Sequence, residues 1–167
     1  MTLGKTVKTY LKRFSEEERE RAFRFFALFS RFEFALKNAG FLKSDRNDVA
    51  HADWNCFAKK HARQLEKDPV FMGARKNLLR HPPKQQRVKD GRVRWEKNPK
   101  RNHETDAVHL IRVVRDVRNN LFHGGKSPDG PKKETARNPM LLDAAMTILE
   151  RCLELDEDVR REFKSPE

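Results

Sequence analysis

The apolar residues of this chain recur at helical spacing over most of its length. At about 100° per residue, the segment between residues 15 and 39 gathers one apolar stripe, made of Ala22, Phe25, Phe26, Phe29, Phe32 and Leu36. Ser15 and Glu18 have the spacing of a capping box at the start of this segment, and Gly40 is suited to its end. The pattern predicts a long amphipathic helix from Ser15 to about Ala39.

Four further segments have the same spacing and suitable residues at their starts. They are expected to form helices over Asp53–Glu66, Pro69–Leu79 and Thr105–Phe122, and from Asn138 onward. In the last of these, Asn138 is placed as an N-cap and Pro139 occupies the first helical position. Its broad apolar face consists of Leu141, Ala144, Ala145, Ile148, Cys152, Leu153 and Leu155. The pattern predicts an all-α helical bundle.

Prolines separate residues 84–101 from the helical segments on either side. Pro82-Pro83 opens this stretch and Asn98-Pro99 closes it, which disfavours a helix. Residues 87–95 are typical of two short strands around Asp90-Gly91, a pair that tolerates the positive φ angles of a tight turn. We therefore expect a small β-hairpin or loop inserted into the helical bundle.

The charge of the chain is concentrated in this insertion. Residues 84–101 hold eight Lys and Arg against two acidic residues, a net +6, which is half of the total of +12. A basic excess favours polyanionic partners, most often nucleic acid, because arginines bind phosphates and aromatic rings stack on bases. The candidate RNA contacts are Arg87, Lys89, Arg92, Arg94, Trp95 and, on the following helix, Arg115. The alternative is a solvated insertion with Trp95 packed against a helix.

Length and composition limit the other possibilities. A chain of 167 residues fits one domain, here residues 1–167. No run approaches the roughly 18 apolar residues of a membrane span, and the first residues lack the apolar block of a signal peptide. Cys56 and Cys152 are widely separated, which suggests reduced thiols in a cytoplasmic protein. No metal-ligand spacing or phosphate-binding glycine loop occurs, so we expect neither a metal nor another cofactor.

Two charged residues fall on or beside apolar stripes. Glu33 lies within the stripe of the first long helix, and Arg118 lies at the edge of the apolar face of residues 105–122. Charges in a core need partners, so we expect a buried Glu33–Arg118 ion pair. The alternative is a small rotation of the first helix that lets Glu33 reach water. On the helix of residues 105–122, His109 and Arg112 are expected on the polar side, where they are either solvated or extend a phosphate-binding surface.

The sequence after this arginine suggests chemistry on a phosphodiester. Arg118, Asn119 and His123 fall within six residues, just before Gly124-Gly125, which permit the last helical turn to unwind. A guanidinium stabilises charge that develops on phosphate, and an imidazole transfers protons near neutral pH. The alternative is that His123 only caps the C-terminus of the helix, where cations are favoured.

The segment Arg118–His123 resembles the R-x4-6-H motif of the HEPN superfamily, which often has Asn after the Arg. The helical framework, over roughly residues 15–66 and 104–164, is similar as well, and Glu33 matches an acidic residue on an early helix of that family. The resemblance implies an all-α bundle that dimerises so that two copies of the motif face each other. It also implies metal-independent endoribonuclease activity of toxin or antiviral systems. Arg118 and His123 would then be catalytic, with Asn119 supporting them and Glu33 orienting Arg118.

Residues and resemblance together predict a homodimeric, metal-independent endoribonuclease that acts on RNA by attack of the 2′-hydroxyl. Some HEPN proteins are not catalytic, so one alternative is a module that only binds RNA or a nucleotide. Another is a helical protein whose basic surface binds a partner chain, such as an acidic antitoxin. Cleavage of RNA in EDTA, salt-sensitive binding without cleavage, or neither would separate these three functions.

Overall fold

The computed structural model describes residues 8–9, 12, 14–80, 82–122 and 139–165. The described part is mostly helical, with two small antiparallel β-hairpins. Its helices are α2 (Glu16–Asn38), α3 (Trp54–Leu65), α4 (Pro69–Arg80), α5 (Asp106–Phe122), α6 (Pro139–Leu153) and α7 (Glu157–Lys164). Its strands are β1 (Leu42–Ser44), β2 (Ala50–Ala52), β3 (Gln85–Lys89) and β4 (Arg92–Glu96). The predicted helical bundle is thus confirmed at this level.

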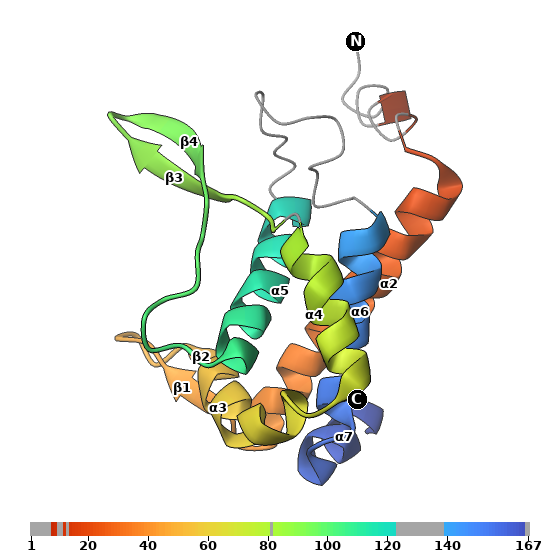
Figure 1. The fold of residues 1–167 in the computed structure, drawn as a ribbon, viewed down its shortest axis with the longest axis vertical. Helices are drawn as coiled ribbons and strands as arrows, with labels where there is room; N and C mark the ends of the chain where they lie inside the picture. The colour runs from red at the N-terminus through yellow and green to blue at the C-terminus, as the bar shows by residue number, and fades with distance from the viewer. Residues whose placement is uncertain (1–7, 10–11, 13, 81, 123–138, 166–167) are drawn as a thin grey trace.

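Helix α6 lies at the centre of the bundle because it has the broadest apolar face. It packs against α2, α4 and α5, while α3 packs on α5 and α7 packs on α2 (Figure 1). Asp68 ties two of these helices together: its carboxylate accepts hydrogen bonds from Val70 and Phe71 N–H at the start of α4 and pairs with Arg151 of α6. None of the described helices combines the length and the apolar character that crossing a membrane requires.

The first long helix is close to its predicted form. The Ser15–Glu18 capping box is present, with both reciprocal hydrogen bonds formed. Phe25, Phe29 and Phe32 are buried, but Phe26 is 40% exposed, so the prediction that it belongs to the core stripe was wrong. The helix is rotated so that Ala35 fills the core instead, which leaves Phe23 and Phe26 together on the surface.

The C-terminal region differs from the single helix predicted there. Helix α6 ends at Leu153, and Asp156 begins α7 by accepting a hydrogen bond from the N–H of Val159. Asp156 is buried, and it also contacts Lys60 and His61 of α3. The break therefore has a physical cause: the N-cap of α7 is also the carboxylate that joins α7 to α3.

The β3–β4 hairpin forms where the sequence predicts it. Asp90 and Gly91 at its turn have positive φ angles of 52° and 68°. Figure 1 shows the hairpin projecting from the helices, and the chain after β4 runs back along α5. The β1–β2 hairpin was not predicted, because each of its strands has only three residues. Asp45 holds the polar turn between them, since its carboxylate accepts hydrogen bonds from the N–H groups of Asn47 and Val49.

Candidate functional site

The last turns of helix α5 hold the part of the Arg–His motif that the structure describes. Val114 and Val117 anchor this end of the helix in the core, which leaves Arg118 half-buried and Asn119 exposed. His123 lies outside the described residues, so its predicted position beside Arg118 stays a prediction.

The Arg118 guanidinium is held against an aromatic ring. Its Cζ lies 5.7 Å from the centroid of the Phe29 ring, and its Nη1 donates a hydrogen bond to Asn119 Oδ1 at 3.1 Å. A cation over the face of a ring is attracted by the electrons of that face. These contacts fix the guanidinium at the edge of the core and join the first two residues of the motif.

Glu33 has a different partner from the one predicted. Trp54 Nε1 donates a hydrogen bond to Glu33 Oε1 at 3.1 Å, and the expected Glu33–Arg118 ion pair is not formed. Glu33 and Arg118 are both half-buried rather than buried, so neither charge needs the other as strongly as a core charge would. The two residues are nevertheless close to one aromatic pair, since the Phe29 and Trp54 rings lie 5.0 Å apart.

The β3–β4 hairpin has two chemically distinct faces. Its register places Arg87 opposite Arg94 and Lys89 opposite Arg92, which makes one basic face. The other face holds Val88, Val93 and Trp95. Val88 is 80% exposed, Val93 is 61% exposed and Trp95 is half-buried. Trp95 therefore does not share a face with the four cations, although the sequence predicts all five residues as RNA contacts.

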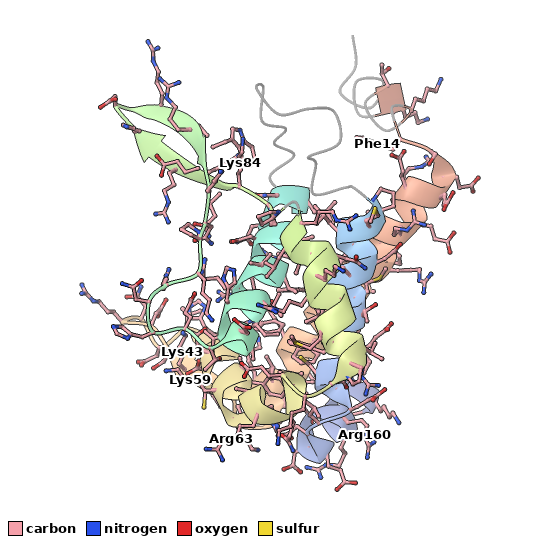
Figure 2. All side chains as sticks on the ribbon, in the orientation of Figure 1. Phe14, Lys43, Lys59, Arg63, Lys84 and Arg160 are labelled. Atoms are coloured by element: carbon pink, nitrogen blue, oxygen red, sulfur yellow. The ribbon has the colours of Figure 1, made fainter. Side chains whose placement is uncertain are left out.

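Asp116 fixes the base of this hairpin to helix α5. Its carboxylate accepts hydrogen bonds from Gln85 Nε2 and Asn98 Nδ2, both at 2.7 Å, and its side chain is buried. Asn120 Nδ2 adds a bond of 2.7 Å to the carbonyl oxygen of Lys84, which Figure 2 shows at the base of the hairpin. The two ends of the hairpin are thereby positioned by the helix that carries the motif. Sequence spacing gave no signal for this role of Asp116.

A small pocket lies between the hairpin base and the motif. Its volume is about 250 Å³, and its lining residues are Gln85, Gln86, Arg87, Asp116, Asn119 and Asn120. The basic face of the hairpin and the exposed side of the motif helix therefore meet in one concave surface. Arg115 is exposed and lies one helical turn before Asn119, on the same side of α5.

The expected solvated face of α5 is largely buried. His109 and Arg112 are 8% and 9% exposed, and the chain that follows β4 contacts Arg112 at Pro99. Arg112 donates to both carboxylate oxygens of Glu104, at 2.8 and 2.7 Å, and to the carbonyl oxygen of Pro99 at 2.9 Å. These bonds from Arg112, with one from the N–H of Arg101, lower the pKa of Glu104 to about 2. Burial, with the nearby Arg112 charge, lowers the pKa of His109.

Within the described ranges, no group of three or more His, Cys, Asp or Glu side chains is placed to hold a metal ion. Two carboxylates before α3 have structural positions instead: Asp53 is the N-cap of α3, and Asp45 accepts hydrogen bonds from backbone N–H groups of its own turn. No family model, curated protein or solved structure matches this chain.

Proposed function

We propose that this protein is a HEPN-like endoribonuclease that cleaves RNA without a metal ion, as expected of toxin or antiviral systems. The observation that supports this most strongly is the shared pocket of Arg87 and Asn119. A basic hairpin whose base is fixed to the motif helix suits a single strand of RNA that passes from the hairpin to Arg118 and His123.

The charges of the hairpin favour a polyanionic partner. Its basic face places like charges directly opposite each other, at Arg87–Arg94 and Lys89–Arg92, which destabilises a free hairpin. The carboxylate of Glu96 offsets this repulsion only in part, because it lies 3.8 Å from Arg87 Nε. A row of phosphates along this face would neutralise all four cations, so the phosphate contacts are assigned to this face and not to Trp95.

The proposed reaction follows from the groups in the motif. The 2′-hydroxyl oxygen of a ribose attacks the adjacent phosphorus, and a base, proposed as one His123, takes the hydroxyl proton. The bond from phosphorus to the 5′-oxygen breaks, and that oxygen receives a proton from an acid, proposed as the second His123 of a dimer. The products are a 2′,3′-cyclic phosphate and a 5′-hydroxyl. Arg118, oriented by Phe29 and Asn119, stabilises the charge that develops on the phosphate.

Exposed aromatic residues beside this site support a homodimer. Phe23 and Phe26 are 67% and 40% exposed, and their ring centroids lie 6.4 Å apart. Phe26 is one helical turn from Phe29, the ring under Arg118. Burial of this surface against a second copy would bring two Arg118 side chains near one interface, as a shared site requires.

The test is incubation of the purified protein with mixed RNA in EDTA. We expect cleavage that yields 2′,3′-cyclic phosphate ends and falls by about 10²–10⁴-fold in His123→Ala. Arg118→Ala should lose activity as well, whereas Arg160→Ala, a change of an exposed arginine on α7, should not. Intact RNA in all samples would contradict the proposed reaction.

A second candidate is an RNA-binding module without catalysis. The basic face of the hairpin favours this function, because its four cations and the pocket at its base form without any contribution from His123. Salt-sensitive RNA binding without cleavage would support this function. Neither binding nor cleavage would favour a helical protein that binds an acidic partner chain such as an antitoxin.

A further inference from the structure

A second and larger pocket lies on the other side of the hairpin base, away from the motif. Its volume is about 470 Å³, within the range of pockets that hold small ligands. The end of α4, the two chains that enter and leave the hairpin, and α5 all contribute to it. Its lining residues are Leu79, Arg80, Pro82, Lys84, Lys97, Asn98, Pro99 and His109.

The charged lining of this pocket is of one sign. Arg80, Lys84 and Lys97 contribute three cations, and no carboxylate belongs to the described lining. Two carboxylates lie behind this wall, and both are already bound: Glu104 by both donors of the Arg112 guanidinium fork, and Asp116 by the amides of Gln85 and Asn98. The pocket is therefore suited to an anion. Leu79 and the two prolines form apolar walls that a phosphate alone would not need.

His109 supplies a hydrogen-bond donor to the wall of the pocket. Arg112 Nη2 lies 3.0 Å from His109 Nδ1. Because a guanidinium can only donate, Nδ1 must be the unprotonated acceptor, and the ring hydrogen is then on Nε2. Nε2 has no hydrogen-bond partner among the described residues, and it is not one of their buried unpaired atoms, so it is open to water at the pocket that His109 lines. A ligand oxygen in the pocket would take the place of water as the acceptor of this N–H.

The surrounding contacts hold this donor in place before any ligand binds. Arg112 is fixed by Glu104 and by the carbonyl oxygen of Pro99, which itself lines the pocket. Asn98, another lining residue, is anchored by its bond to Asp116. The side chains of this wall are thus already held in place by hydrogen bonds when a ligand binds, which lowers the entropy cost of binding.

We propose that this pocket binds a nucleoside phosphate. Its phosphate would be held by Arg80, Lys84, Lys97 and the Nε2–H of His109, with the sugar and base against the apolar walls. His109 lies nine residues before Arg118 on α5, which at 1.5 Å per residue separates the two sites by roughly 13 Å. The site is therefore distinct from the motif, and its occupation does not depend on catalysis.

Two sources share this chemistry: a free nucleotide and the phosphorylated 5′ end of an RNA. The experiment is titration calorimetry of the full chain with AMP, ATP, adenosine, and a short RNA with or without a 5′-phosphate. We expect binding of AMP and ATP, or of the 5′-phosphorylated RNA in preference to its 5′-hydroxyl form, and the pattern identifies the source. Adenosine should bind at least tenfold more weakly than AMP. No difference between phosphorylated and unphosphorylated ligands would overturn the proposal.

Variants test the location of the site. Arg80→Gln with Lys97→Gln should weaken nucleotide binding by at least tenfold, whereas Lys89→Gln with Arg92→Gln, the same charge change at the hairpin tip, should have little effect. Arg118→Ala should abolish cleavage but keep nucleotide binding, so failure of one site is separable from failure of the other. In the unmodified protein, AMP or the phosphorylated RNA should shift the ring resonances of His109 in NMR spectra. An unchanged His109 spectrum at saturation would also contradict the proposal.

Discussion

The carboxylate of Asp116 accepts a hydrogen bond from Asn98 Nδ2 at 2.7 Å, although 18 residues separate them in the chain. With the bond from Gln85, this contact fixes both ends of the β3–β4 hairpin to α5. The same helix holds Arg118 near its C-terminus and His109 near its start. One helix thus positions the motif, the basic hairpin and the second pocket relative to one another.

Asp116→Ala should loosen the hairpin without unfolding the bundle. The change leaves the Gln85 and Asn98 amides without their charged acceptor, so we expect the free energy of unfolding to fall by about 1.5–3 kcal/mol. Urea unfolding measures the loss, and limited proteolysis should show faster cleavage at residues 85–98. Asp158→Ala, on an exposed part of α7, should change neither measurement. Unchanged proteolysis of the hairpin would contradict the role of Asp116.

The basic face of the hairpin should account for much of the salt dependence of RNA binding. Arg87→Gln with Arg94→Gln removes two opposed cations from this face. If both contact phosphates, the slope of log K against log salt should decrease in magnitude by about 1.4, since each phosphate contact on a single strand contributes about 0.7. Filter binding at several salt concentrations measures the slope. Arg160→Gln with Arg161→Gln on α7 is the matched control, and an equal effect there would refute a specific surface.

Much of the fold could be predicted from local pattern, because helical periodicity and end residues act over a few positions. The Ser15–Glu18 cap and the Asp90-Gly91 turn are examples: each depends on neighbouring backbone groups alone. The buried His109 and Arg112 could not be predicted in this way. Their burial depends on the chain after β4 returning along α5, a contact between segments that no local period encodes.

The candidate site likewise combines features that the local sequence predicts with features that depend on contacts between distant segments. The basic hairpin and the position of Arg118 at the end of an apolar helix follow from sequence alone. The partner of Glu33 does not, since Trp54 has no feature in the sequence that distinguishes it from any other core aromatic residue. A charge on an apolar stripe predicts a polar neighbour, but it does not identify which one.

Glu33→Gln should be tolerated because the indole N–H of Trp54 can still donate to the amide oxygen of the glutamine. We expect a change in unfolding free energy of at most about 1 kcal/mol. Trp54→Phe should cost more, about 1–3 kcal/mol, because it leaves Glu33 without this donor and removes volume from a fully buried site. Chemical denaturation of both variants measures this. A larger loss in Glu33→Gln than in Trp54→Phe would indicate that the charge of Glu33 has another essential partner.

Phe23→Ser with Phe26→Ser should weaken dimerisation. Both rings are exposed, so the substitution removes apolar surface from the proposed interface at little cost to the core. Sedimentation equilibrium should show a dimer for the unmodified protein and a shift toward monomer for the variant, with loss of RNA cleavage in parallel. Val70→Ser, which changes an exposed apolar residue on α4, serves as the control. A monomer at all concentrations for the unmodified protein would contradict the shared site.

Glu104 should make the protein sensitive to acid. Its pKa is about 2 in the folded protein, against a usual value of 4.5, because the Arg112 guanidinium binds its charged form. A depressed carboxylate pKa stabilises the folded state above pH 4.5, and this contribution is lost as the pH falls from 4.5 toward 2. At ~1.4 kcal/mol per pH unit, the loss between pH 4.5 and 2 amounts to about 3.5 kcal/mol.

Glu104→Gln should remove this dependence and lower stability at pH 7, because it leaves the buried Arg112 without its counter-charge. Urea unfolding at a series of pH values between 7 and 2 measures both effects. Glu96→Gln, at an exposed carboxylate of the hairpin, should keep the acid dependence of the unmodified protein. Parallel pH profiles for Glu104→Gln and the unmodified protein would show that the Glu104–Arg112 pair does not cause the acid sensitivity.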